Sequence, residues 1–187
     1  MVHVSFTKIR NNVLVPRIPS ILAKGEDDKI KRICFCKSLE KALTAMPYSG
    51  KAVYELFMLG KDGILDPLLH VYTPKDIDPC NLLSSDIISS LCPDALFTGE
   101  VWVMNQKVKC MHHIIRIKDI EVLAHKDIFD NEVFYVDKIS FEFVPRLTSR
   151  APEVVLKPLI DQGYDIRQIL VEVLYDHRMQ KLNSCEV

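Results

Sequence analysis

Apolar positions in the first two thirds of this chain occur mostly in short runs, several of which alternate with polar residues. Alternation puts successive side chains on opposite faces, as in a half-buried strand. The pattern predicts strands over residues 2–6, 32–36, 52–58, 68–72, 101–104, 107–117, 120–124 and 132–144. Turn-forming residues such as Lys61-Asp62-Gly63 separate several of them, so this part of the chain is expected to be rich in strands.

Helical spacing of apolar residues is found in fewer places. A helix is predicted over 39–46, with Ser38 as its N-cap, and a short one over 82–92. Residues 153–182 carry two apolar stripes at helical spacing, interrupted at Pro158 and Gly163. We therefore expect a C-terminal helical pair packed on or beside the sheet.

Together these elements predict an α+β fold. The expected sheet is bent or split, mixed and mostly antiparallel, with flanking helices and a C-terminal helical extension. Residues 1–145 form the expected main domain, and residues 146–187 the extension packed on it. The residues expected in the core are Ile33, Phe35, Leu43, Val53, Leu56, Val71, Val101, Trp102, Val103, Ile115, Ile117, Leu170 and Val173.

Composition narrows the functional classes. The 24 basic and 25 acidic residues give a net charge of −1, which argues against a protein that grips nucleic acid by bulk electrostatics. No apolar run is long enough to span a bilayer and no leader-like segment opens the chain, so we expect a cytoplasmic protein without a membrane partner. There are only six glycines and neither a GxGxxG nor a GxxxxGK[ST] motif, so a nucleotide would be held by side chains and strand backbones.

The six cysteines match neither a zinc framework nor a compact disulfide scaffold. Reduced, buried thiols are the simplest interpretation. His112 and His113 follow Cys110, but adjacent residues of a strand face opposite sides, so the two histidines are not expected to share a metal ion. We therefore predict no metal site.

Several polar residues nevertheless suit the recognition of a dinucleotide. His3 and Ser5 lie two residues apart, on one face of the first strand, where they can bond ribose hydroxyls. Arg17 and Arg32 carry planar forks that suit a pyrophosphate. Glu100 precedes a strand, and a fixed carboxylate stabilises the positive charge that develops on a ribose when its bond to nicotinamide breaks.

Each of these residues also has an ordinary structural interpretation. His3 is equally a strand histidine without a ligand. The two arginines have acidic partners available at residues 26–28, and Glu100 is equally a solvated carboxylate. Ser38 is first of all a helix cap, although a cap and a ligand contact do not exclude each other.

Four segments carry a resemblance to a known family. His3-Val4-Ser5, Pro16-Arg17-Ile18-Pro19, Arg32-Ile33-Cys34-Phe35 followed by Ser38, and Thr98-Gly99-Glu100-Val101-Trp102 look like the pattern in small bacterial and phage proteins of the ADP-ribosyltransferase-like superfamily. The resemblance covers roughly residues 1–120. It implies a split sheet that clamps NAD, with NAD as a substrate.

The resemblance also implies roles for individual residues. His3 would hold a ribose, Ser38 would occupy the middle-strand position, and Glu100 would be the catalytic carboxylate. Two features depart from the pattern. Thr98 stands where many active members have Gln or Glu, which leaves the acceptor open, and no tyrosine follows the second strand, so stacking on nicotinamide would fall to Phe35 or Tyr48.

Three functional hypotheses follow. In the first, the protein is an enzyme that transfers ADP-ribose from NAD to a protein or nucleic-acid acceptor. In the second, it binds a nucleotide or a host protein without turnover, for example as a phage-encoded inhibitor of bacterial defence. In the third, its C-terminal helices form a homodimer or an interface with a partner protein.

Overall fold

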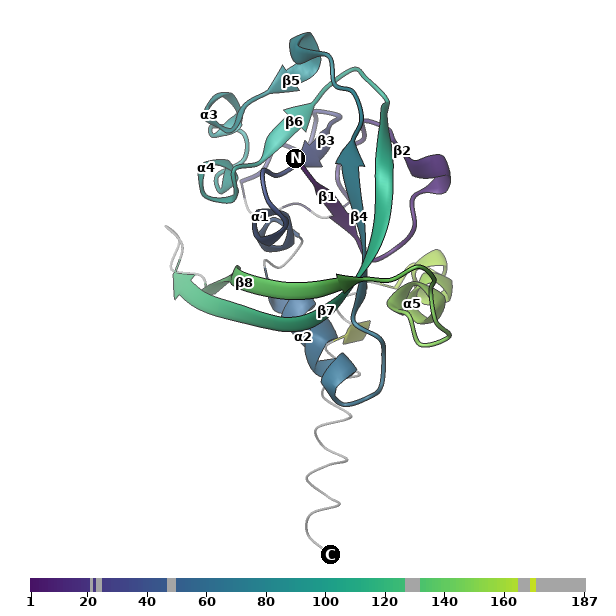
Figure 1. Ribbon diagram of the computed structural model, residues 1–187. Coiled ribbons are helices and arrows are strands. Elements are labelled where there is room, and N and C mark those ends of the chain that lie inside the picture. Colours follow the sequence, from purple (N-terminus) through teal and green to yellow (C-terminus); the bar gives the residue numbers. More distant parts are fainter. Residues whose placement is uncertain (21, 23–24, 47–49, 127–131, 165–168, 171–187) are drawn as a thin grey trace, which may run out of the picture.

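The computed structural model describes residues 1–187 apart from 21, 23–24, 47–49, 127–131, 165–168 and 171–187 (Figure 1). Its main sheet is antiparallel, with the strand order β1-β4-β7-β2 and with β8 paired to β7. The strands are β1 (His3–Ser5), β2 (Val13–Leu14), β4 (Leu68–Pro74), β7 (Val108–Lys126) and β8 (Glu132–Phe143). Beyond β4, strand β7 continues with β8 as a long two-stranded ribbon (Figure 1).

A second, smaller antiparallel sheet has the order β3-β6-β5. Its strands are β3 (Ile33–Phe35), β5 (Leu82–Leu83) and β6 (Val101–Val103). Val2 bridges to Cys36 at the end of β3, and the next residues of the chain pair with β4 instead. The two sheets therefore diverge at the start of β1, and the expected α+β class with mostly antiparallel sheets is confirmed.

Apolar side chains form three layers around the two sheets. The first lies between the main sheet and the helices α1 (Leu39–Thr44) and α2 (Lys51–Lys61). The second lies between the sheets and includes Phe35, Tyr72 and Val101. The third covers the other face of the small sheet, where Trp102 packs with α3 (Ser85–Ile88) and α4 (Ala95–Thr98).

The strand predicted over 52–58 is wrong, because this segment lies within helix α2. Its buried residues are Ala52, Val53, Leu56, Phe57 and Leu59, which recur at helical rather than alternating spacing. A short apolar run does not distinguish a buried strand from a buried helix, and packing against the main sheet decides in favour of the helix. The helix predicted over 82–92 is shorter than expected, because β5 occupies its first two residues.

The other predicted strands are found, and residues 107–117 and 120–124 belong to the single strand β7. Ser38 caps α1 as predicted, since its hydroxyl accepts a hydrogen bond from the backbone N–H of Lys41. Every residue expected in the core is buried except Val173, which lies outside the described residues.

The C-terminal part contributes helix α5 (Pro152–Asp161), which runs through Pro158, so the break predicted there is wrong. Leu156 of α5 joins the main apolar core and is 2% exposed. Most of the second half of the predicted helical pair lies outside the described residues. None of the described helices has the length and apolarity that crossing a bilayer requires.

Candidate functional site

His3 lies at the point where the two sheets diverge. Its imidazole is half-buried, with ring centroids 6.1 Å from Phe35 and 6.2 Å from Tyr72, and its Nδ1 lies 2.9 Å from the carbonyl oxygen of Cys34. A carbonyl only accepts, so Nδ1–H of His3 is the donor. Burial lowers the pKa of His3, which keeps the ring neutral near pH 7 and leaves Nε2 as an unprotonated acceptor. No described residue bonds to that Nε2.

The strand register continues from His3 across the main sheet to further polar residues, of which Tyr72 (0% exposed) and His70 (2% exposed) are buried. His3 on β1 is opposite Tyr72 on β4, which is opposite His112 on β7, while Ser5 is opposite His70. Residues directly opposite each other in antiparallel strands share a face of the sheet. The ring centroids of Tyr72 and His112 are 4.8 Å apart and those of His70 and His112 are 5.0 Å apart. We call His3, Ser5, His70, Tyr72 and His112 the polar face.

A hydrogen-bonded chain joins helix α5 to this polar face. Nε2 of His70 lies 2.6 Å from Oε2 of Glu153, and Nδ1 of His70 lies 2.7 Å from Nε2 of His112. Because a carboxylate only accepts, Nε2–H of His70 donates to Glu153, and the unprotonated Nδ1 of neutral His70 accepts from Nε2–H of His112. Nδ1 of His112 is then unprotonated, and no described residue bonds to it.

Electrostatics keep both of these histidines neutral. Burial lowers the pKa of His70, and this effect outweighs the nearby Glu153 carboxylate. Burial also lowers the pKa of His112, and the positive charge of Lys8 adds to the effect. Near neutral pH the hydrogen-bonded series Glu153–His70–His112 therefore consists of one carboxylate and two neutral imidazoles. In this state His112 can take up a proton.

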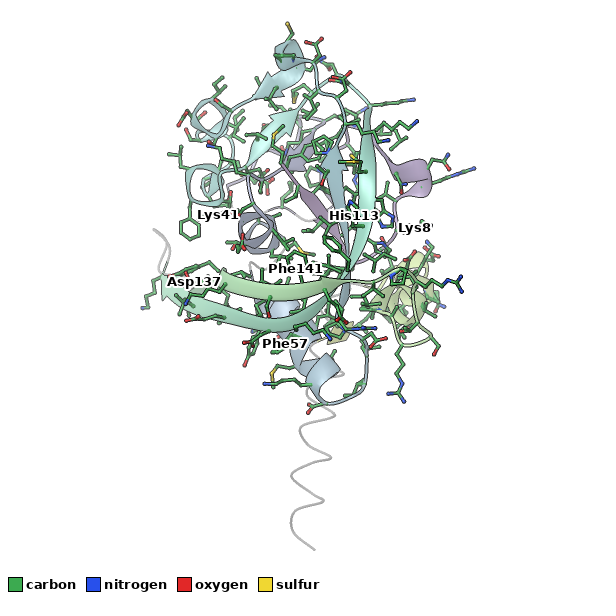
Figure 2. All side chains as sticks on the ribbon, in the orientation of Figure 1. Lys8, Lys41, Phe57, His113, Asp137 and Phe141 are labelled. Atoms are coloured by element: carbon green, nitrogen blue, oxygen red, sulfur yellow. The ribbon has the colours of Figure 1, made fainter. Side chains whose placement is uncertain are left out.

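His112 is also one of the residues that line a shallow hollow of about 430 Å³. The hollow is lined by His112, His113, Ile114, Phe143, Val144 and Pro145. His113 faces away from the polar face and contacts the ring of Phe143 at 5.3 Å, as expected for adjacent residues of one strand. Figure 2 labels His113 on β7 and Phe141 on β8. His112 thus presents a proton acceptor beside a partly apolar wall.

Two cations lie beside the polar face. Arg17 is exposed, its backbone bridges to Arg32, and its charge lowers the pKa of His3, which places its guanidinium near that ring. Lys8 is exposed too and lowers the pKa of both His70 and His112. Of the predicted site residues, the structure brings together His3, Ser5 and Arg17.

Glu100 lies in a different place. It is 5% exposed, its Oε1 accepts a 2.7 Å hydrogen bond from Nε1 of Trp102, and its carboxylate also bonds the thiol of Cys34. The side chain of Cys34 is on the opposite face of β3 from that of Phe35, which contacts His3. His3 and Glu100 therefore lie on opposite faces of the small sheet, and the structure does not bring them into one cleft.

Arg32 is also separated from the polar face. Its side chain is fully buried, bonds Oε1 of Glu26 at 2.5 Å and the carbonyls of Asp27 and Ile30 at 2.9 Å, and stacks 4.1 Å from the ring centroid of Trp102. Glu26, one of the acidic residues predicted as a partner for Arg32, therefore forms an ion pair with it. Ser38 likewise uses its hydroxyl as the cap of α1.

Glu100 and Arg32 belong to one group of residues, which we call the Glu100 cluster. Its members are Glu26, Arg32, Cys34, Cys92, Glu100 and Trp102. Ligand atoms of Glu26, Cys92 and Glu100 lie within 4.8 Å of one another, a spacing that a metal ion would accept. However, the guanidinium of Arg32 already balances Glu26, and burial raises the pKa of Cys92, which keeps its thiol protonated. The cluster is therefore a compact ionic network without an open ligand position for a metal.

Comparison with known proteins adds no relative: no family model matches the chain, and neither the curated proteins nor the solved structures contain a match. The assignment of a site depends on the geometry alone.

Sequence reasoning missed four residues of this region, His70, Tyr72, His112 and Glu153. Alternation along 68–72 puts His70 and Tyr72 on one face, a signal that was available. What the sequence does not contain is the register that sets Tyr72 opposite both His3 and His112. Glu153 comes from a helix far along the chain, and only the tertiary fold places it beside His70.

Proposed function

We propose that this protein binds NAD on the polar face, in the manner of ADP-ribosyltransferase-like proteins. The observation that carries the proposal is the state of His3, a neutral imidazole whose Nδ1 is fixed by Cys34 and whose Nε2 accepts no hydrogen bond from the described residues. Such a nitrogen can accept a bond from a ribose hydroxyl. Its position where the two sheets separate agrees with the split sheet that the resemblance implies.

Neighbouring side chains supply the other groups that a dinucleotide requires. Arg17 offers an exposed planar fork for the pyrophosphate. The hydroxyl of Ser5 accepts from the backbone N–H of Thr7 at 3.1 Å, and its own hydrogen stays available for a ribose oxygen. Two strand spacings, about 10 Å, separate His3 from His112, and the buried ring of Tyr72 lies between them.

Two outcomes are open for bound NAD. ADP-ribose is transferred to a protein or nucleic-acid acceptor, or NAD is held without turnover, as in a binding module that acts on a host protein. Binding without turnover gains support from Glu100, because the carboxylate assigned to catalysis by the resemblance is buried on the far side of β3. Transfer then requires a different catalytic group.

Isothermal titration calorimetry with intact NAD tests the proposal. Arg17→Gln removes a charged hydrogen-bond donor, worth about 1.5–3 kcal/mol, and should weaken binding by about tenfold to a hundredfold. His3→Phe keeps a ring beside Phe35 and removes the acceptor nitrogen, so it should weaken binding by about tenfold.

Lys138→Gln is the matched control for lost charge, because Lys138 is exposed on β8 and, within the described part of the chain, pairs only with Glu121 and Asp137. The control should bind NAD like the wild type. Absence of NAD binding to the wild type, or equal binding by Arg17→Gln and the wild type, contradicts the proposal.

A further inference from the structure

The polar face contains a second arrangement that the binding of NAD does not require. Glu153, His70 and His112 form a continuous chain with separations of 2.6 and 2.7 Å. One end is a carboxylate on α5, and the other is an unbonded ring nitrogen of His112, a residue that lines the hollow. Two successive imidazoles oriented by a carboxylate are more than packing or ribose contact demands.

We propose that His112 is a general base that takes a proton from a hydroxyl group in the hollow, and that His70 and Glu153 are positioning residues that fix its tautomer. The assignment follows from the bonding pattern, in which Glu153 holds the proton of His70 on Nε2 and His70 holds that of His112 on Nε2. Nδ1 of His112 is left to accept. A proton gained there is shared along the chain toward the negative Glu153.

This inference rests on the proposed binding of NAD and specifies its chemistry. Nδ1 of His112 accepts the proton of the hydroxyl group, whose oxygen forms a bond to C1′ of the nicotinamide ribose. The C1′–N bond breaks, and its electron pair passes to the pyridinium nitrogen, so nicotinamide leaves as a neutral molecule. With water as the hydroxyl source, NAD and water give ADP-ribose, nicotinamide and one proton, which His112 returns to solvent.

The surroundings of His112 suit this step. The charged and titratable groups that face it are Lys8 from the loop after β1, His70 and Tyr72 from β4, and Glu153 from α5, with His113 next to it on β7. Burial raises the pKa of Tyr72 to about 12, and its hydroxyl accepts from the backbone N–H of Ile9, so Tyr72 stays neutral. The cationic Lys8 favours the neutral form of His112 before the proton is transferred.

Nitrogen-15 NMR of the histidines, without ligand, tests the bonding pattern independently of any activity. In the wild type, both His70 and His112 should be protonated on Nε2 and unprotonated on Nδ1 at pH 7.5. Glu153→Gln should lower the pKa of this histidine pair, because the carboxylate that stabilises the protonated form is lost. A wild-type His112 that carries its hydrogen on Nδ1 overturns the proposal.

Release of nicotinamide from NAD tests the chemical step, with purified protein alone to detect water as the hydroxyl source and with added lysate and labelled NAD to detect an acceptor. His112→Gln should lower the rate by about a hundredfold or more and change the calorimetric affinity for NAD less than threefold. Glu153→Gln should lower the rate by about tenfold and move the acidic limb of the rate profile to lower pH. Lys138→Gln should behave like the wild type.

The two proposals fail in different ways. If calorimetry shows no binding of NAD, the proposed function is overturned and the NAD step falls with it. If NAD binds but the wild type releases no nicotinamide in either setting, or His112→Gln releases it as fast as the wild type, the general base alone is overturned.

Discussion

The polar face and the Glu100 cluster lie on opposite sides of the small sheet, and they differ in how completely their polar groups are hydrogen-bonded. In the Glu100 cluster, Glu100 bonds Trp102 and Cys34, and Glu26 bonds Arg32. Each of these partners is mostly or fully buried. The polar face ends instead in two unprotonated nitrogens, on His3 and His112, that no described residue bonds.

This difference shows why a shifted pKa alone does not locate a functional site. Burial raises the pKa of Glu100 and lowers those of His3, His70 and His112, so both regions are perturbed. Structural ion-pair networks and active sites shift pKa values by the same causes. What separates the two regions is that only the polar face keeps hydrogen-bonding capacity available to a ligand.

The largest expected effect comes from breaking the closed cluster. Arg32→Met leaves Glu26 and two backbone carbonyls without their buried donor, and the loss of one partner of a buried ion pair typically costs about 3–5 kcal/mol. Urea unfolding should show this loss. Lys138→Gln, which breaks an exposed and solvent-screened pair, should cost far less. Equal losses in the two variants would show that the cluster is not a stabilising network.

The pH dependence of stability should distinguish the two regions by sign. The lowered pKa values of His3, His70 and His112 mean that, below pH 6.5, the unfolded state binds protons that the folded state does not. This contribution therefore makes the protein less stable as the pH falls below 6.5. Each unit of difference in pKa corresponds to about 1.4 kcal/mol.

Glu100 should have the opposite dependence. Its pKa is raised above 4.5, so the folded state keeps a proton that the unfolded state loses as the pH rises through this window. Glu100→Gln retains an oxygen for Trp102 and removes the titration, so the variant should gain stability relative to the wild type as the pH rises from 4.5. Urea unfolding of both proteins between pH 4.5 and 8 measures this, and a difference that is independent of pH contradicts the assignment.

A smaller effect is expected at Ser38, which lies in neither region. Ser38→Ala removes the acceptor for the backbone N–H of Lys41 and should cost about 1 kcal/mol of stability. Because its hydroxyl caps α1, the substitution should leave the calorimetric affinity for NAD unchanged. A loss of affinity with unaltered stability would instead support the contact with NAD that the resemblance implies.

Local signals in the sequence were sufficient for much of the fold. Ser38 and the apolar spacing that follows it predicted α1, and alternation predicted β4, β6, β7 and β8. Residues 52–58 misled because an apolar run with few polar positions satisfies either periodicity until its packing partner is known.

Prediction of the candidate site was partial for a different reason. His3, Ser5 and Arg17 lie close together in sequence, and local reasoning could group them. Glu100 was grouped with them by the chemistry of a carboxylate and by the resemblance, but it bonds Trp102 and Cys34 on the other side of the small sheet. The contact between Glu153 and His70 spans 83 positions of sequence, a pairing that no local pattern encodes.

Helix α5 gives the expected boundary at residue 145 an unexpected meaning. A fragment that ends there retains every described strand and all three imidazoles of the polar face, but it lacks the carboxylate of Glu153, which determines which nitrogen of His70 carries the hydrogen. A protein made by joining residues 1–145 to another sequence would therefore keep both sheets and lose the carboxylate of Glu153 that orients His70. Helix α5 is thus part of the proposed acid–base site, and exchanging this helix is a way to change the proton affinity of His112.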